Sequence, residues 1–296
     1  MEVIAIANRK GGVAKTLTTR SLATCLSRLG YRVLAVDADP QTDLTEQFGV
    51  PVRKLTEMKK LTFAELTNAE LQNRINKVNG IDEVFEYDAS EAILKLDENL
   101  SLLPTTEALT MTKERFVLVP PEDNKDVTRT ILDSVEDQYD FVLIDCPPDL
   151  SSMTVNLLSS SDSVIIPAFP EQQSYSKIVS MLSTIAKIKK TSNPNISVHG
   201  ILFTDVDLRT NIARIYMEQI PKRCPVYVYD RYIPHAVASK EAVANNVSVF
   251  DYKKDSRVAL AYAKFTLEFL ERNEEMCKEG LINAEIPKPK KVVKKK

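Results

Sequence analysis

The chain has 296 residues and a mass of 33.3 kDa, and its 44% apolar and 27% charged residues are ordinary for a soluble globular protein. No apolar run approaches the roughly 20 residues that a membrane-spanning helix needs. The first residues, MEVI, have the pattern of a buried strand and lack the basic start and cleavage site of a signal peptide. We therefore expect a cytoplasmic protein without integral membrane association.

Four cysteines and two histidines are scattered along the chain. None of the cysteines forms a C-x-x-C pair or has a histidine at metal-ligand spacing. We expect ordinary thiols in a reducing compartment, and no metal site built from these residues.

The formal net charge of −2 hides a basic C-terminus. Six of the final nine residues are lysines, and without them the charge would be −8. A basic tail on an acidic body suggests a polyanionic partner, although a merely solubilising end would have the same composition. Helical periodicity is lost from Asn273, so we predict one domain over 1–272 and a flexible tail over 273–296.

Short apolar runs alternate with helical patterns, and no period of 20–50 residues repeats. Strands are predicted at 3–7, 31–36, 141–144, 164–167, 197–203 and 225–229, and helices at 16–29, 172–190 and 256–272. Near-continuous apolar strands separated by helices indicate an α/β fold, with a doubly wound, mostly parallel sheet covered on both faces. Residues 51–100 are polar, with weak helical and strand signals, and we interpret them as an elaboration on the edge of the sheet.

A glycine-containing turn, NRKGGVAKT at 8–16, lies between the first predicted strand and the first helix. Adjacent glycines let the backbone curl so that successive N–H groups point at an anion, and the following helix adds its positive end. Lys15 can reach the outer phosphates, and the Thr16 hydroxyl can ligate Mg²⁺. The turn therefore predicts a site for ATP and Mg²⁺ made by Gly11, Gly12, Val13, Ala14, Lys15 and Thr16.

Acidic residues follow two other predicted strands. Asp37 and Asp39 come after the second strand, and Asp145 ends the strand at 141–144. Binding residues of parallel sheets lie at the carboxyl ends of strands, so these aspartates are expected beside the glycine turn. A lone aspartate at a strand end is often only a helix cap, whereas three beside such a turn favour a binding site.

The turn departs from the strict G-x-x-x-x-G-K-[ST] pattern, because Arg9 and Ala14 stand where that pattern has glycines. The remaining K-G-G-x-x-K-[ST] resembles the deviant P-loop of the ParA/MinD ATPases. DADPQ at 37–41 and FVLIDCPP at 141–148 resemble further motifs of that family. The resemblance covers roughly 1–272, is weakest across 51–100, and implies a P-loop ATPase that binds ATP and Mg²⁺ and dimerises.

The resemblance also implies roles for single residues. Lys10 would reach across the dimer to the nucleotide of the other subunit, and Asp39 would help to position the attacking water. Asp37 would lie near the Mg²⁺ shell, and Asp145 would hold the ion through water. The adenine base would lie near the segments at 203–205 and 232–234, which contain Thr204, Asp205 and Pro234.

Members of the family that the turn resembles use it for different functions. The cysteines lack the spacing of shared iron–sulfur clusters, and the helix at 258–272 is too apolar all round for a Min-type membrane helix. We therefore expect a slow, nucleoid-associated DNA-partition ATPase, stimulated by a ParB-like centromere-binding protein. Because the turn follows the first strand directly, no operator-reading domain is expected. A MinD-like positioning adaptor and a P-loop metabolic ligase remain alternatives.

Nonspecific DNA binding is expected at basic side chains away from the nucleotide. The candidates are Lys187, Lys189, Lys190, Arg209, Arg214, Lys222 and Arg223. Their concentration in the C-terminal half favours contacts with phosphates, although an ordinary solvated surface would also carry such residues.

Overall fold

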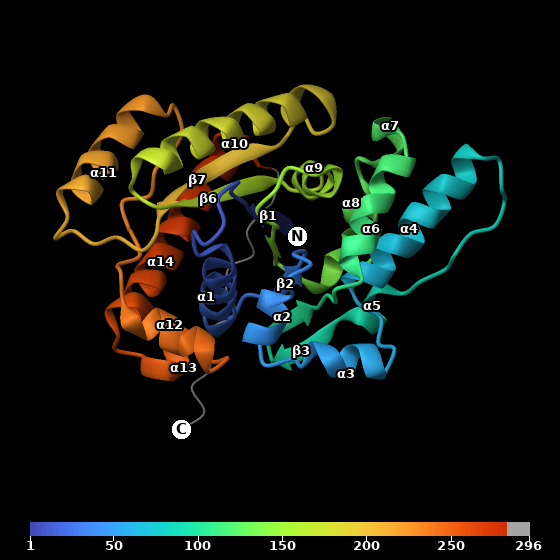
Figure 1. Cartoon of the computed structure of the whole chain (residues 1–296), viewed down its shortest axis with the longest axis horizontal. Coiled ribbons are helices and arrows are strands. Elements are labelled where there is room, and N and C mark those ends of the chain that lie inside the picture. The colour runs from blue at the N-terminus through green and yellow to red at the C-terminus, as the bar shows by residue number, and fades with distance from the viewer. Residues whose placement is uncertain (283–296) are drawn as a thin grey trace.

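A seven-stranded sheet forms the centre of the computed structural model, which describes residues 1–282 (Figure 1). The strand order is β3-β4-β2-β5-β1-β6-β7, and only the β3–β4 pair at one edge is antiparallel. The strands are β1 (Glu2–Ile6), β2 (Val33–Asp37), β3 (Leu94–Asp97), β4 (Leu100–Leu103), β5 (Phe141–Asp145), β6 (Ser163–Ala168) and β7 (Ser197–Phe203). The predicted α/β fold with a mostly parallel sheet is confirmed.

Helices cover both faces of this sheet (Figure 1). One face packs against α1 (Lys15–Arg28) and α14 (Arg257–Lys278), and the other packs against α4, α6, α8, α9 and α10. The helices besides α1 and α14 are α2 (Asp43–Gln47), α3 (Val52–Glu57), α4 (Phe63–Val78), α5 (Ala89–Ala92), α6 (Leu109–Arg115), α7 (Pro121–Asn124), α8 (Val127–Asp133), α9 (Ser152–Ser159), α10 (Gln172–Thr191), α11 (Asn211–Arg223), α12 (Val237–Ala244) and α13 (Val249–Lys253). Within residues 1–282, no helix is long and apolar enough to cross a membrane.

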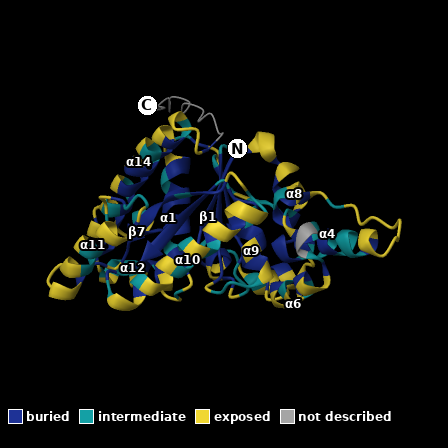
Figure 2. Cartoon of the chain, turned by 90° about the horizontal axis from the view of Figure 1, so that it is seen from above, coloured by how far each residue is buried: buried dark blue, intermediate teal, exposed yellow. Residues whose placement is uncertain are grey.

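The strands other than the edge strand β3 are mostly apolar because both of their faces are buried, whereas Lys95 and Asp97 of β3 are exposed. In β1, Val3 and Ala5 pack on the side of α10, whereas Ile4 and Ile6 pack on the side of α1 and α14. Figure 2 shows the resulting layers, with a buried sheet between helices whose outer surfaces are exposed. Since side chains fill both faces, the carboxyl edge of the strands is where loops are left to form a site.

The predicted strand at 225–229 is wrong. This segment makes a single parallel bridge, between Val228 and Ile201 of β7, and Pro225 has no N–H to donate to a ladder. Its aromatic residues pack onto Gly200 instead, where a Cβ atom would lie 2.7 Å from the ring of Tyr229. The buried strand β4, in contrast, is not predicted from the sequence. It has only four residues and directly follows a polar segment.

The C-terminal helix α14 continues to Lys278, so the predicted domain boundary at Asn273 is too early. Asn273 is fully buried, and its side chain donates a 2.6 Å hydrogen bond to Glu2 and lies 3.2 Å from the Nε2 atom of His199. Because Asn273 is polar, it interrupts the helical period of apolar residues, and the helix is predicted to end there. The Lys-rich end of the predicted tail, at 288–296, lies outside the described residues.

Residues 51–100 contain α3, α4 and α5, the edge strand β3 and the first residue of β4. Helix α4 packs against α6 and α8 on one face of the sheet. The segment therefore extends one edge of the sheet and adds to one helical layer.

Candidate nucleotide-binding site

The loop between β1 and α1 turns through two residues with left-handed backbone. Gly12 has φ +75° and Ala14, the residue before the helix, has φ +60°. Glycine adopts this conformation freely, whereas a residue with a Cβ atom pays about 1–2 kcal/mol. Strain of this kind is retained where the surrounding structure requires the conformation, as at binding sites. The space around Gly11 and Gly12 is open, so the backbone of the loop is accessible to a ligand.

Hydrogen bonds from the loop to the ends of β6 and β7 hold it in place. The Asn8 amide donates to the Pro167 carbonyl at 2.6 Å, and the Thr204 hydroxyl donates to the Val13 carbonyl at 3.1 Å. Asn8 and Thr204 are both buried. Thr204, predicted to lie near the base of a nucleotide, therefore contacts the loop backbone and is not part of the cavity lining.

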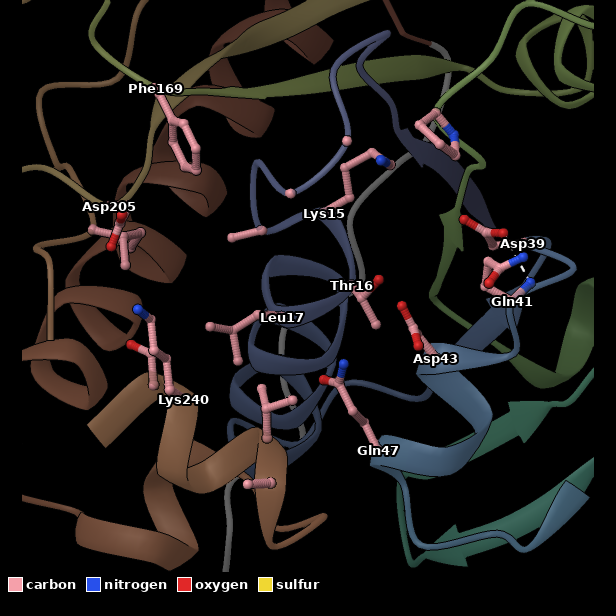
Figure 3. A pocket seen from close by; sticks show the side chains of 18 of the residues that line it. Lys15, Thr16, Leu17, Asp39, Gln41, Asp43, Gln47, Phe169, Asp205 and Lys240 are labelled. Carbon is pink, nitrogen blue, oxygen red and sulfur yellow. Dashed lines mark hydrogen bonds between the residues drawn. The ribbon is translucent and has the colours of Figure 1, made fainter. Parts of the chain in front are cut away.

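A cavity of about 570 Å³ opens in front of the loop. Figure 3 shows Lys15 and Thr16 on the first turn of α1, with Asp39, Gln41 and Asp43 on one side and Phe169, Asp205 and Lys240 on the other. This volume is within the usual range for sites of small molecules and cofactors. Of the predicted nucleotide contacts, the cavity is lined by Gly11, Gly12, Ala14, Lys15, Thr16, Asp205 and Pro234.

Two buried aspartates lie beneath the first turn of α1, on adjacent strands. The Thr16 hydroxyl donates to Asp145 at 2.7 Å, and the Thr45 hydroxyl and N–H donate to Asp37 at 2.6 and 2.8 Å. Asp37 of β2 and Asp145 of β5 are opposite each other in the strand register. The structure thus brings Thr16, Asp37 and Asp145 to one place, as expected from their positions at strand ends.

Burial raises the pKa of Asp37 to about 7 and that of Asp145 to about 8, and the neighbouring Asp37 adds to the second shift. Charging both carboxyl groups in this position is costly without a nearby cation. Hydroxyl and carboxylate oxygens are the ligands that Mg²⁺ prefers, usually one or two carboxylates completed by phosphate and water. In the described part of the chain, no three acidic, cysteine or histidine side chains form a metal cage. The site therefore fits Mg²⁺ bound together with a phosphate.

Lys10 does not line the cavity, and its side chain contacts its own subunit. It forms an ion pair with Glu171, and its amino group lies 4.9 Å from the centre of the Phe169 ring. Its backbone N–H donates to the Asn8 side chain at 3.1 Å. The residue predicted to act on a second subunit thus lies against Glu171 and Phe169 at the start of α10.

The seven candidate DNA-binding residues are all exposed and fall into two groups. The α10 group, Lys187, Lys189 and Lys190, lies at the C-terminal end of α10, which is directed away from α11 (Figure 1). The α11 group is Arg209, Arg214, Lys222 and Arg223. Arg209 precedes α11 rather than lying on it, and Lys222 and Arg223 belong to its last turn rather than following it.

Sequence reasoning missed part of the cavity lining. Asp43 and Gln47 lie on α2, and their closeness in sequence to the strand-end residues Asp37 and Asp39 is the signal that points to them. Lys240 lies on the short helix α12 and belongs to no motif, so only the fold reveals it. A second cavity of about 370 Å³ beside Arg209 and Arg214 is also lined by Arg257, a basic residue that was not predicted.

Comparisons with known proteins agree with this geometry. Residues 1–198 match the family model AAA_31, described as an AAA domain. The chain is 31% identical to the sporulation initiation inhibitor protein Soj of Bacillus subtilis, covering 90% of this chain and 97% of Soj. It is 29% identical to the chromosome-partitioning ATPase Soj of Thermus thermophilus, over 92% of this chain and 96% of the relative.

A similar solved structure is cobyrinic acid a,c-diamide synthase from Mycobacterium smegmatis, with a bound ATP analogue and magnesium. It has a TM-score of 0.74 and 28% sequence identity, and the match covers 93% of this chain and 96% of that one. The fold, the strand–loop–helix turn and the similarity over nearly the whole chain lead to one conclusion. The chain belongs to the ParA/MinD superfamily of P-loop ATPases.

Proposed function

We propose that this protein is a Mg²⁺-dependent ATPase that works as a dimerising switch in DNA partition. The observation that carries the proposal is the arrangement of Lys15 and Thr16 above the buried pair of Asp37 and Asp145, at one end of a 570 Å³ cavity. The names of the relatives support the process, since one of them is a chromosome-partitioning ATPase.

The triphosphate of ATP would lie against the backbone of the loop, at the positive end of α1. Lys15 would neutralise the outer phosphates, and the Thr16 hydroxyl with the two buried aspartates would hold Mg²⁺, which would stabilise the charge that develops during phosphoryl transfer. Asp39 lines the same cavity and is only partly buried, so its carboxylate can orient a water molecule there. The adenine base would lie toward Asp205 and Pro234.

Two subunits would close face to face over their nucleotides, each donating its Lys10 to the partner's phosphates. A cation that only the partner can deliver makes activity depend on association. This role for Lys10 is supported by the resemblance of the loop and by the position of Lys10 directly before the exposed glycines.

The closed dimer would bind nonspecific DNA through the exposed basic groups at α10 and α11, in the cytoplasm and on the nucleoid. Phosphate contacts by lysine and arginine suffice for such binding and make it dependent on salt. A ParB-like centromere-binding protein would stimulate hydrolysis and so release the dimer from DNA.

The test measures retention of the protein on nonspecific DNA with ATP, with ADP and with the Lys10→Ala variant in ATP. We expect retention by the wild type in ATP alone. Equal retention under all three conditions would refute the switch.

A second function, an ATP-dependent ligase, is favoured by the similarity to cobyrinic acid a,c-diamide synthase. The cavity lining also reaches Gln47 of α2 and Val243 of α12, beyond the P-loop. Formation of ADP that depends on a small carboxylic acid substrate and is indifferent to DNA would favour the ligase.

A further inference from the structure

Two contacts hold the Lys10 side chain, and a third fixes its backbone. Its amino group pairs with Glu171 and lies 4.9 Å from the ring centre of Phe169, and its backbone N–H donates to Asn8. Asn8 in turn donates to the carbonyl of Pro167, on the strand that leads to Phe169 and Glu171. The loop and the start of α10 therefore form one connected unit around the Lys10 ammonium group.

Glu171 is placed for this contact by the chain around it. It is the N-cap residue of α10, a position where a carboxylate commonly accepts a hydrogen bond from the helix backbone. Here its side chain makes no such bond. Its own N–H donates to the Phe169 carbonyl at 2.9 Å, which fixes a turn through Pro170 and directs the carboxylate toward Lys10.

We propose that Glu171 is a positioning residue that holds Lys10 within its own subunit and competes with the partner's nucleotide for it. The inference rests on the proposed function, in which Lys10 crosses the dimer. The Lys10 amino group lies against Glu171 and Phe169 and outside the cavity lining, so the proposed crossing to the other subunit's phosphate requires it to leave this contact. Each subunit must therefore release Lys10 from Glu171 before the closed dimer forms, which disfavours the dimer.

The size of the effect follows from exposure. The side chains of Lys10 and Glu171 are 21% and 38% exposed, so solvent screens the pair substantially. Partly exposed ion pairs shift equilibria by about twofold to fivefold. A symmetric dimer breaks two pairs, and the two factors multiply, so loss of Glu171 should tighten the dimer by about fourfold to 25-fold.

The experiment measures the dimer dissociation constant of the full chain by sedimentation, with Mg²⁺ and a saturating non-hydrolysable ATP analogue. Glu171→Gln keeps the size of the side chain and removes its charge, and we expect it to lower the constant by about fourfold to 25-fold. Glu171→Asp keeps a charge at the start of α10 but shortens its reach, and should fall between Gln and the wild type. Glu218→Gln, which breaks an exposed ion pair with Lys222, is the matched control and should not change the constant.

Lys10→Ala and the double variant with Glu171→Gln complete the cycle. If Glu171 acts through Lys10, its removal gives no gain in the Lys10→Ala background, whereas a general effect of charge on nucleotide binding would persist there and overturn the proposal. A wild type that dimerises together with an unchanged or weaker Glu171→Gln dimer would refute this inference and leave the proposed function standing. If neither protein dimerises, both are refuted.

Discussion

Asp37 and Asp145 lie opposite each other on adjacent parallel strands, and both carboxyl groups are buried. Parallel pairing places the carboxyl ends of β2 and β5 at the same edge, so two residues 108 positions apart meet beneath the phosphate loop. Neither carboxyl group gains from this burial in the absence of a cation. The pair is thus evidence for a site whose structure favours binding over stability.

The ligand-free protein should lose stability as the pH rises from about 4 to about 8, with no further loss from these two groups above that range. In the unfolded chain these carboxyl groups titrate near pH 4. In the folded protein their pKa values are about 7 and about 8, so the folded state binds more protons between these limits. The stability that they contribute is complete below the unfolded pKa and is lost as the pH passes the folded values. Urea unfolding at about pH 5, 6.5 and 8 measures the slope, and Asp145→Asn should make it shallower. A slope that does not change in this variant would exclude Asp145 as the cause.

Lys15→Ala should weaken ATP binding by about 10-fold to 100-fold, because a hydrogen bond between charged groups contributes about 1.5–3 kcal/mol. Lys15 is buried on the first turn of α1 and lines the cavity beside the glycine loop, whereas the other lining lysine, Lys240, comes from α12. Calorimetric titration measures the affinity. Lys95→Ala, at an exposed position on the edge strand β3, is the control and should bind ATP as the wild type does.

Gly200→Ala should destabilise the fold by about 1–3 kcal/mol, the usual range for an overpacked core. The added methyl group would lie 2.7 Å from the ring of Tyr229, which is buried between β7 and α14. Chemical denaturation measures the loss. Adding Tyr229→Leu should cost less in the Gly200→Ala protein than in the wild type, and simple additivity of the two changes would contradict the proposed clash.

The two basic groups should differ in their effect on DNA binding. Arg209 and Arg214 line a cavity with Arg257 and with Asp207, which pairs with Arg209, so the cavity keeps a net positive charge that can meet a phosphate backbone. Replacing Arg209 and Arg214 by alanine should weaken DNA binding and reduce the slope of log affinity against log salt by about 1 for each phosphate that the protein no longer neutralises. Alanine at Lys187, Lys189 and Lys190 tests the α10 group in the same way. An unchanged slope for both sets would place the DNA interface elsewhere.

Local patterns predicted most of the sheet and the phosphate loop. Residues 8–16 combine a strand, two glycines and a helix start within a few positions, and the fold adds nothing to that signal beyond the left-handed Ala14. Likewise, the sequence predicts that Asp37 and Asp145 lie close together, because the carboxyl ends of parallel strands share one edge of the sheet.

The rest depends on contacts between distant parts of the chain. Thr204 supports Val13 across 191 positions, and Lys10 meets Glu171 across 161. The predicted helix stops before Asn273, because a polar residue looks out of place on a buried helix face. Its partners, Glu2 and His199, are on strands far away in the sequence. No local period contains such information, so the roles of these residues appear only in the folded chain.

Calorimetric titration with the non-hydrolysable ATP analogue, with and without Mg²⁺, tests the central claim most directly. The account predicts saturable binding of one nucleotide per chain that requires Mg²⁺ and is weakened in Asp145→Asn. No uptake of the nucleotide in magnesium buffer, or uptake that is indifferent both to the metal and to Asp145, would contradict it.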